Sequence, residues 1–402
     1  MSGWPNRVMR YRLNQDNNIL STMTKFNTKA VHSGQEPEKE FGSVIPPIYQ
    51  TTTYAQEHPA QTKGYDYTRA GNPNFTNLEQ AIAALEGGTY ATVFSSGLAT
   101  VTALLHILKP GDKVLGINDM YGGTYRLMTK VFEKMGVGFK TMPFEDLEAV
   151  KQELATGSYT LLSFETPTNP LLRITDIEEA CAAAKKHDVI SFVDNTFASP
   201  ALQQPLEQGA DIVWHSTTKY IGGHSDVVGG AIITNHEHYK AAFDFARLSM
   251  GLNPSPFETW LTHRGLKTLG VRMDRHCTNA KSIAHMLEEH PKVDKVYYPG
   301  LASHSGHATA AKQMSDFGGM VSFELKASVE VTASKISQFK HFTLAESLGG
   351  IESLVNHPAT MTHASIPADV RHKAGLADGL VRLSVGIEDL DDLMDDLRFV
   401  LD

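Results

Sequence analysis

The chain has 402 residues, of which 41% are hydrophobic and 20% are charged, and its net charge is −9. This composition fits a globular protein of about two or three domains, and the acidic balance without a basic stripe argues against a nucleic-acid partner. No apolar run of about 18 residues occurs, which argues against a membrane-spanning helix. Two distant cysteines without CxxC spacing argue against a disulfide framework and fit a reducing cytoplasm.

The N-terminal part of the chain shows no clear hydrophobic period. Residues 1–22 lack the apolar stretch of a secretory signal, so we expect a disordered extension before Met23, with a transit peptide as the weaker alternative. Up to residue 72 the sequence is rich in Pro, Thr and Tyr. We expect this stretch to form an arm rather than a domain with its own core.

Between about residues 74 and 235, helical patterns alternate with short apolar runs. The spacing of apolar residues predicts a helix over 76–88 and another over 99–112, stopped by Pro110. An amphipathic stretch is also present at 176–187. Buried strands separated by helices predict a mostly parallel sheet covered on both faces. The apolar runs that predict these strands are residues 113–117, 159–164, 189–193 and 211–215.

The pattern changes after about residue 255. Residues 256–290 predict one long helix, bent near Gly265 and Gly270. Strands alternating with helices then predict a smaller α+β domain, with strands at 293–298, 318–325 and 380–386. We therefore divide the chain into an N-terminal extension and arm, a large domain and a C-terminal domain, at residues 1–72, 73–262 and 263–402.

Two polar residues follow buried strands that are consecutive in the chain. Asp194 ends the run 189–193, and Lys219 follows the run 211–215, with room for one short helix around 200–209. A right-handed strand–helix–strand crossover brings both carboxyl ends to one edge of the sheet, where ligands bind in open α/β folds. We therefore expect Asp194 and Lys219 to be neighbours in space.

The residues near this edge predict a phosphorylated ring cofactor. A lysine in a partly dry site forms a Schiff base with an aldehyde, a carboxylate such as Asp194 partners a cationic ring nitrogen, and Tyr121 offers a ring for stacking. Pyridoxal 5′-phosphate (PLP) satisfies all of these features. The phosphate of PLP suits two sets of residues. Hydroxyl groups come from Ser216 and Thr218, and a helix start is formed by Ser96, Gly97 and Leu98.

Three other interpretations have less support. A dinucleotide-binding oxidoreductase needs a G-x-G-x-x-G motif after a strand, and the sequence has none. A metal site at His215, His224 or residues 236–238 lacks ligand spacing, so a surface or indirect role fits these histidines better. A catalytically silent relative would have lost Lys219 or Asp194, and both are present.

Long motifs run through the chain: "YDYTRAGNP", "SSGLATV", "DMYGGTYR", "ETPTNP", "VDNTF", "STTKYIGGHSDVVGG", "FTLAESLGGIESL" and "VRLSVGIEDL". With these motifs the chain resembles the PLP-dependent enzymes of cysteine and methionine metabolism from about Thr28 to the C-terminus. The resemblance implies the α/β fold of type I PLP enzymes, which is aspartate aminotransferase-like, with a seven-stranded, mostly parallel sheet in the large domain. It also implies a homotetramer, built as a dimer of dimers with shared active sites.

The resemblance implies a role for each motif residue. Lys219 would bond the cofactor and move protons, Asp194 would keep the ring nitrogen protonated, and Tyr121 would stack on the ring. Further cofactor contacts would come from Ser96, Gly97, Leu98, Thr196, Ser216 and Thr218, and from Tyr67 and Arg69 of the neighbouring subunit. The amino-acid substrate would be bound through its carboxylate by Arg382, and otherwise by Ser347, Asn169, Glu346, Arg126, Thr362 and Glu165.

Within this family, the resemblance implies a carbon–sulfur lyase. The expected reaction is γ-elimination of L-cystathionine to L-cysteine, 2-oxobutanoate and ammonia, with hydrogen sulfide release from cysteine as a further activity. Glu346 suits the distal ammonium of cystathionine. Gly123 stands where methionine γ-lyases usually carry cysteine, and the segment around Glu346 lacks the aromatic residues usual in bacterial cystathionine β-lyases.

The alternative reaction is that of a cystathionine γ-synthase, which replaces the acyl group of an O-acyl-L-homoserine with cysteine. Ala70 stands where synthases that accept O-succinylhomoserine often carry arginine, and this favours the lyase. A methionine γ-lyase is the least favoured alternative. Residues 254–269 also resemble the corresponding segment of the lyases. The sequence supplies no physical reason why this segment should affect the reaction.

Overall fold

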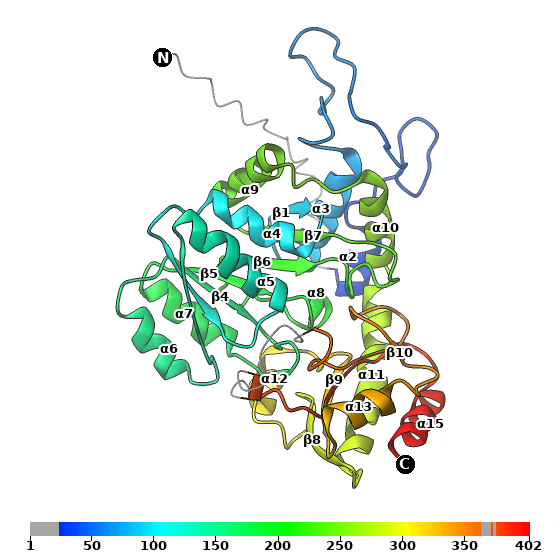
Figure 1. Ribbon diagram of the computed structural model, residues 1–402. Helices are drawn as coiled ribbons and strands as arrows, with labels where there is room; N and C mark the ends of the chain where they lie inside the picture. The colour runs from blue at the N-terminus through cyan, green and yellow to red at the C-terminus, as the bar shows by residue number, and fades with distance from the viewer. Residues whose placement is uncertain (1–23, 363–370, 373–374) are drawn as a thin grey trace.

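The computed structural model describes residues 24–362, 371–372 and 375–402. The extension expected over residues 1–22 lies outside this part of the chain. Two sheets organise the described residues, a large one in the upper body of Figure 1 and a smaller one below it. Among the described residues, no helix is long and apolar enough to cross a membrane. The α-helices of this part of the chain are α2 (Phe26–His32), α3 (Pro73–Leu85), α4 (Gly97–Ala103), α5 (Gly122–Leu127), α6 (Leu147–Leu154), α7 (Ile177–Lys186), α8 (Ser199–Leu202), α9 (Glu237–Met250), α10 (Pro256–Leu266), α11 (Leu269–Glu288), α12 (His307–Gln313), α13 (Val329–Ile336) and α15 (Leu390–Leu401).

The large sheet has seven strands in the order β1-β7-β6-β5-β4-β2-β3. Strand β7 is antiparallel to β1 and β6, and the other neighbours pair in parallel. The mostly parallel sheet predicted from the alternating pattern is therefore confirmed. Its strands are β1 (Tyr90–Phe94), β2 (Lys113–Ile117), β3 (Gly138–Met142), β4 (Leu161–Glu165), β5 (Ile190–Asp194), β6 (Ile212–Ser216) and β7 (Gly230–Thr234).

Both faces of this sheet are buried, because successive residues of its strands enter different hydrophobic cores. Val193 and Val213 pack with residues of α3, α6, α7 and α8. Phe192 and Trp214, which are stacked rings, pack with residues of α4 and α9 on the opposite face. The layered arrangement leaves the carboxyl edge of the parallel strands as the place where polar side chains gather.

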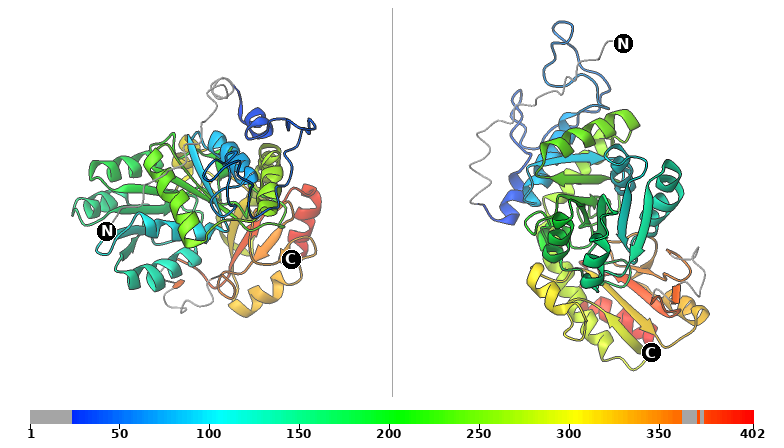
Figure 2. Two further views of the ribbon diagram at one scale, coloured as in Figure 1. Left: turned by 90° about the horizontal axis from the view of Figure 1, so that it is seen from above. Right: turned by 90° about the vertical axis from the view of Figure 1, so that its left-hand side faces the viewer.

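The second sheet has five strands in the order β10-β11-β12-β9-β8. Helices α11, α13 and α15 lie against it at the lower end of the molecule in Figures 1 and 2. Residues of α11 and α15 share its hydrophobic core. The strands are β8 (Val293–Tyr297), β9 (Met320–Leu325), β10 (Thr343–Leu344), β11 (Leu354–Asn356) and β12 (Leu380–Ser384).

Two helix predictions were wrong in extent. The helix predicted over 99–112 ends as α4 at Ala103 and continues only as a 3-10 turn to His106. The long helix predicted over 256–290 is divided into α10 and α11. The division lies between the two glycines where a bend is predicted. Both glycines allow close contact with other segments: a Cβ on Gly265 would lie 2.1 Å from Gly222 O, and one on Gly270 would lie 1.8 Å from Asn27 Oδ1.

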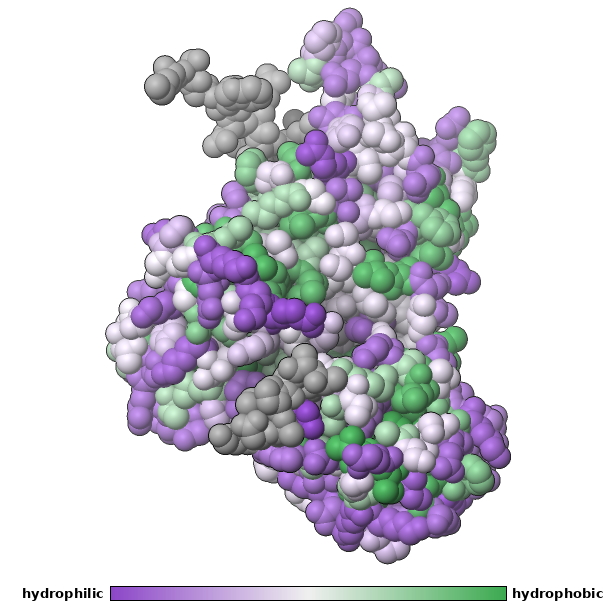
Figure 3. All heavy atoms as spheres, viewed as in Figure 1, coloured by the Kyte–Doolittle hydropathy of each residue, from purple (hydrophilic) through white to green (hydrophobic). Residues whose placement is uncertain are grey.

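The N-terminal arm extends from the upper body as loops (Figures 1 and 2). It is joined to itself by an isolated bridge between Thr53 and Tyr67, and Asn72 then caps the start of α3 by accepting from Asn74 N. In Figure 3 hydrophobic surface is visible at the upper right, where the arm and α10 lie in Figure 1. Exposed apolar side chains of the arm are Phe41, Val44, Ile45, Ile48, Tyr49 and Tyr67.

Candidate active site

Lys219 lies in the turn after β6, at the carboxyl edge of the large sheet. Its Nζ donates a 2.6 Å hydrogen bond to Ser347 Oγ, which comes from the segment between β10 and β11. The pKa of Lys219 is lowered to about 8, first by burial and then by the positive charge of Arg382, while Glu346 opposes both effects. A lysine in this state supplies a neutral, nucleophilic amine close to neutral pH.

The segment that carries Ser347 packs directly on the backbone of the lysine turn. Gly349 has a φ of +77°, and a Cβ at this position would lie 2.7 Å from Tyr220 N. Ser347 itself has a φ of +82°, which is uncommon for a residue with a side chain. The close approach at Gly349 is what brings the Ser347 hydroxyl within reach of the lysine amine.

Arg382 is a buried cation in β12, with 2% of its surface exposed. Its Nη1 donates to Asn169 Oδ1 at 2.8 Å and its Nη2 to Ser347 O at 2.9 Å. Its Nε has no hydrogen-bond partner in the described part of the chain. Burial lowers the pKa of Arg382 to about 10, so the side chain stays charged at neutral pH. Such a guanidinium suits a carboxylate ligand.

Glu346 is an exposed carboxylate next to Ser347. Its negative charge raises the pKa of both Lys219 and Arg382, so it lies within electrostatic range of both cations. The site therefore combines a fixed cation and an anion that both act on the lysine amine. This arrangement suits a substrate with a carboxylate at one end and an ammonium group at the other.

Asp194 ends strand β5. Its Oδ1 accepts hydrogen bonds from Thr196 N at 2.9 Å and Thr196 Oγ1 at 2.5 Å, whereas Oδ2 accepts none from the described residues. Thr196 Oγ1 also accepts from Ser216 N at 2.9 Å, so it joins Asp194 to the turn that carries Lys219. No direct hydrogen bond joins Asp194 and Lys219. Burial raises the pKa of Asp194 to about 6, while the hydrogen bonds from Thr196 and then His215 oppose this rise.

Glu165 ends β4 and pairs in register with Asp194. Its expected contact with the substrate stays a prediction. The structure places its carboxylate on two backbone groups, because it accepts from Tyr121 N at 3.1 Å and from Asn169 N at 2.7 Å. Burial, and then the charge of Asp194, raise the pKa of Glu165 well above its ordinary value. Glu165 therefore positions Tyr121 and Asn169.

A further carboxylate, Asp119, was missed by the sequence analysis. It is buried, and it accepts a 2.5 Å hydrogen bond from Thr168 Oγ1. Burial raises its pKa to about 6, while Thr168 and then Arg173 oppose the rise. Asp119 lies in the motif "DMYGGTYR", two residues before Tyr121, and this position was the signal that could have identified it.

The side chains expected around a phosphate lie near the start of α4. Ser96 caps this helix by accepting from Ala99 N at 3.0 Å. A Cβ on Gly97 would lie 2.8 Å from Ser216 Cβ, so the helix start and the lysine turn are in contact. Thr218 Oγ1 accepts from Gly229 N at 3.1 Å. Leu98, which is 36% exposed, follows Gly97 in the first turn.

Tyr121 is 45% exposed and precedes α5. Its ring lies over Gly123, because a Cβ at Gly123 would be 2.4 Å from Tyr121 Cε1. Thr362 lies near the same turn: its carbonyl oxygen is 3.8 Å from the place of a Cβ on Gly122, and its hydroxyl donates to Asn356 Oδ1 at 3.4 Å. Arg126 is exposed on α5 and makes no polar contact with the residues around Lys219.

Tyr67 and Arg69 belong to the arm and contact neither Lys219 nor Asp194. The Arg69 guanidinium lies 5.5 Å from the centroid of the Tyr67 ring, and its Nη1 donates to Leu248 O at 3.0 Å. Both side chains are exposed. Within this one chain, the structure therefore keeps these two predicted cofactor residues apart from the others.

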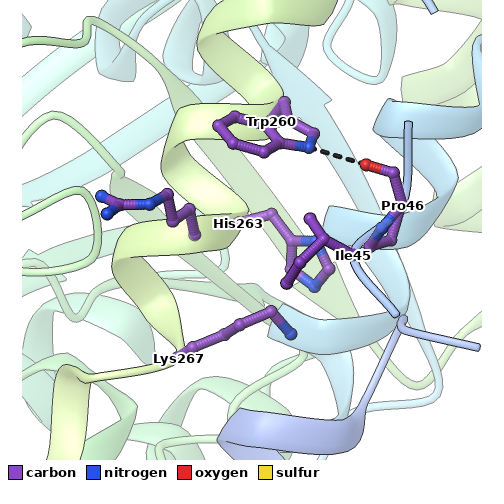
Figure 4. A pocket seen from close by; sticks show the side chains of 6 residues that line it. Ile45, Pro46, Trp260, His263 and Lys267 are labelled. Carbon is purple, nitrogen blue, oxygen red and sulfur yellow. Dashed lines mark hydrogen bonds between the residues drawn. The ribbon is translucent and has the colours of Figure 1, made fainter. Parts of the chain in front are cut away.

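Residues of the segment 254–269 line a pocket between the arm and α10 (Figure 4). Trp260 Nε1 donates to Pro46 O at 2.8 Å, and Lys267 Nζ donates to Val31 O at 2.9 Å. His263 Nε2 lies 3.3 Å from Ser33 O. One side of α10 therefore holds the arm. The pocket shares no lining residue with the site around Lys219.

The residues around Lys219 fit PLP. The lysine amine has a lowered pKa, Asp194 keeps one oxygen without a hydrogen bond from the described chain, and Tyr121 exposes its ring. Hydroxyl and backbone groups at the start of α4 and at Ser216 lie on the same edge of the sheet. The lysine amine matches the aldehyde of the cofactor, Asp194 its ring nitrogen and Tyr121 the face of its ring. The hydroxyl and backbone groups match its phosphate.

Comparison with known proteins agrees with this site. The family model described as "Cys/Met metabolism PLP-dependent enzyme" matches residues 27–402. A cystathionine β-lyase of Lactococcus lactis subsp. cremoris is 49% identical over 380 residues, which are 94% of this chain and 100% of that protein. A cystathionine γ-lyase of Dictyostelium discoideum is 47% identical over 379 residues, 94% of this chain and 98% of that protein. A crystal structure of cystathionine γ-synthase from Xanthomonas oryzae pv. oryzae in complex with cystathionine has a TM-score of 0.92 and 45% identity, covering 94% of this chain and 98% of that one.

Proposed function

The chain belongs to the Cys/Met metabolism family of PLP-dependent enzymes, and from this premise we propose that it cleaves L-cystathionine at Cγ. The products are L-cysteine, 2-oxobutanoate and ammonia. Pyridoxal 5′-phosphate is the cofactor, and the fold is that of type I PLP enzymes. When bound, PLP supplies an electron sink for the negative charge that develops at Cα of the substrate.

Lys219 holds the cofactor and moves protons in this proposal. Its neutral amine would take the proton from Cα of the substrate, and a second proton would leave Cβ so that the Cγ–S bond can break. Protons then return to carbon, and water supplies the oxygen of 2-oxobutanoate as ammonia is released. The electron pair of the Cγ–S bond leaves with sulfur, which becomes the thiol of cysteine after protonation. The pKa of about 8, lowered by burial, supports the role because the amine gains and loses a proton near neutral pH.

Asp194 and Tyr121 orient the cofactor in this proposal. Asp194 holds the ring nitrogen protonated through its carboxylate, and Thr196 fixes that carboxylate with two hydrogen bonds. Tyr121 stacks on the ring and assists proton transfer. Glu165 supports the position of Tyr121 by accepting from its backbone N–H. The phosphate is bound by the edge formed by Ser96, Gly97, Leu98, Ser216 and Thr218.

Glu346 is the observation that carries the choice of substrate. Arg382 binds the substrate carboxylate, and Asn169 and Ser347 orient the guanidinium. Glu346 then offers an exposed carboxylate within electrostatic range of Arg382 and Lys219. Cystathionine has an ammonium group at its far end, whereas methionine has an uncharged methyl group there. The charge at Glu346 therefore favours cystathionine over methionine. Arg126 and Thr362 complete the proposed substrate site.

A cystathionine γ-synthase is the second candidate. The X. oryzae structure in complex with cystathionine supports it, because that protein is 45% identical over nearly the whole chain. Glu346 suits cystathionine equally well as the product of a synthase. Relatives named cystathionine β-lyase are also close in sequence, so the position of C–S cleavage must be determined by product analysis.

We further propose the three-part division at residues 1–72, 73–262 and 263–402, and a homotetramer that forms its active sites between subunits. The isolated position of Tyr67 and Arg69 supports shared sites, since these residues lie apart from Lys219 within one chain. The exposed apolar side chains of the arm support burial against a second copy. Two buried cysteines without a disulfide support a cytoplasmic location.

Steady-state assays with two substrate systems test the proposed reaction. Purified holoenzyme receives L-cystathionine alone, or O-acetyl- or O-succinyl-L-homoserine with cysteine. We expect 2-oxobutanoate and cysteine from cystathionine, with the higher kcat/KM. A higher kcat/KM for the ester with cysteine would establish the synthase instead. Pyruvate and homocysteine from cystathionine would show cleavage on the Cβ side and refute γ-elimination.

A further inference from the structure

A buried pair of titratable residues, Glu86 and His215, lies outside the proposed catalytic residues. Both are 0% exposed, and His215 Nε2 is hydrogen-bonded to Glu86 Oε1. Asn195 Nδ2 donates a second hydrogen bond of 2.8 Å to the same oxygen. A single carboxylate at the end of α3 therefore holds side chains at the ends of two neighbouring strands, β5 and β6.

Glu86 occupies an unfavourable place for a carboxylate. It is the C-terminal cap of α3, where the negative end of the helix dipole opposes a negative charge. Glu86 Oε2 and His215 Nδ1 are both buried without a hydrogen-bond partner in the described part of the chain. An apolar pair of similar volume would fill this space without these penalties, so packing alone does not explain why charged groups are present.

The pair contacts the two strand ends that form the proposed site. Asn195 directly follows Asp194, and His215 directly precedes Ser216 in β6. Above the pair, Thr196 Oγ1 joins Asp194 Oδ1 to Ser216 N. The carboxylate of Glu86 thus holds Asn195 and His215. These two residues are the sequence neighbours of Asp194 and Ser216, which Thr196 connects.

The pair also affects the charge of Asp194. Burial raises the pKa of Asp194, and the hydrogen bonds from Thr196 and then the interaction with His215 oppose that rise. On the other side, Glu165 pairs in register with Asp194, and burial and then the charge of Asp194 raise the pKa of Glu165 well above its ordinary value. Together with the hydrogen bonds from Thr196, His215 therefore favours the ionised form of Asp194 against burial. The Glu86 carboxylate supplies the counter-charge for His215 inside the protein.

We infer that Glu86 and His215 are positioning residues that keep Asp194 ionised and in place, so that the ring nitrogen of bound PLP stays protonated. This inference rests on the proposed function, in which Asp194 is the partner of the ring nitrogen. A glutamine at position 86 keeps a carbonyl oxygen for His215 and Asn195 but removes the negative charge. Without this counter-charge, a positive charge on the buried His215 ring is no longer stabilised, so Asp194 loses an interaction that favours its ionised form.

The test measures the protonation of the ring nitrogen directly. Wild type, Glu86→Gln and His215→Gln are reconstituted with PLP labelled with 15N in the ring, and the 15N chemical shift is recorded for each holoenzyme. Asp194→Asn serves as the reference for loss of the partner carboxylate. Glu207→Gln is the matched control, because Glu207 is exposed and its Oε1 lies 2.9 Å from the place of a Cβ on Gly87.

We expect a protonated ring nitrogen in wild type and Glu207→Gln. In Glu86→Gln and His215→Gln the signal should move toward that of neutral pyridine, as in Asp194→Asn. The dissociation constant for PLP should rise about tenfold, which corresponds to one pKa unit of lost stabilisation of the charged form. The signal comes from the PLP-bound, folded fraction, so a variant with a lower folded yield still reports on the site.

Two results would overturn the proposals separately. Unshifted ring-nitrogen signals in both Glu86→Gln and His215→Gln, with a clear shift in Asp194→Asn, would refute the role of the buried pair alone. A wild-type enzyme that fails to bind PLP, or that binds it with an unprotonated ring nitrogen, would refute the role of Asp194 and with it the proposed function.

Discussion

Lys219 Nζ and Ser347 Oγ are joined by a 2.6 Å hydrogen bond, so the turn after the large sheet and the segment before β11 meet at the reactive amine. The backbone oxygen of Ser347 accepts from Arg382 Nη2 at 2.9 Å. One residue therefore contacts both the proposed proton carrier and the proposed carboxylate binder. Its hydroxyl serves the first, and its backbone serves the second.

This division predicts a selective effect of Ser347→Ala. The substitution removes the hydroxyl that holds Lys219 but keeps the carbonyl that holds Arg382. We expect kcat to fall about tenfold, which corresponds to about 1.4 kcal/mol and is typical of one lost hydrogen bond, whereas KM changes little. Ser337→Ala, at an exposed serine after α13, is the control. A rise in KM without a fall in kcat would contradict the assignment.

The lowered pKa of Lys219 predicts how cofactor binding depends on pH. The amine reacts only when neutral, and burial sets its pKa at about 8. The rate at which the apoenzyme recombines with PLP should therefore rise with pH and level off above about 8, about tenfold per pH unit below that point. Stopped-flow absorbance measures this rate.

Two neighbouring charges should move that midpoint in opposite directions. Arg382→Gln removes a positive charge that lowers the pKa of Lys219, so the midpoint should rise. Glu346→Gln removes a negative charge that raises the pKa, so the midpoint should fall. A wild-type midpoint near that of an ordinary lysine, or shifts of the same sign in both variants, would contradict the described electrostatics.

Glu346→Gln should distinguish substrates with and without a distal ammonium group. Removal of an exposed charge pair is expected to raise KM for cystathionine about two- to fivefold, since such pairs contribute up to about 1 kcal/mol. Cysteine, which lacks the distal group, should be turned over as by wild type. Glu330→Gln, at an exposed position on α13, controls for loss of surface charge. Equal losses for both substrates would remove the proposed role of Glu346.

Mixed variants test whether active sites are shared between subunits. Arg69→Ala and Lys219→Ala should each be poorly active alone, and Arg69→Ala should also retain PLP less well. After subunit exchange about half of the dimers are hybrids with one intact site, so about a quarter of wild-type activity should return. Mixing either variant with the Arg69→Ala/Lys219→Ala double variant makes no intact site and is the control. Lack of recovery in the first mixture would show that each site is formed within one chain.

Four strands of the large sheet, β2, β4, β5 and β6, were predicted because each is a short apolar run between polar turns, whereas β1, β3 and β7 were not predicted. The run at 113–117 coincides with β2, and the others differ from their strands by one or two residues. The bend predicted near Gly265 and Gly270 lies where α10 and α11 are divided, but the close contacts of these glycines with Gly222 and Asn27 could not be predicted. Helical periodicity contains no information about such contacts.

The site could be predicted in part for a similar reason. Asp194 and the lysine turn follow from strand ends, which local sequence reveals, and Arg382 and Ser347 follow from family motifs. Glu86 was treated only as part of a helix end, and His215 was given a surface or indirect role. Their burial and mutual contact depend on the packing of α3 under β6, which local sequence does not reveal.

The central claim is that Lys219 carries the cofactor, and borohydride reduction tests it most directly. Holoenzyme is reduced with borohydride, digested and analysed by mass spectrometry, with Lys219→Arg as the control. We predict loss of the visible absorbance and a reduced pyridoxyl phosphate adduct on the peptide that contains Lys219, and no adduct in Lys219→Arg. An unlabelled Lys219 peptide from enzyme that has bound PLP, or an adduct on another lysine, would contradict the account.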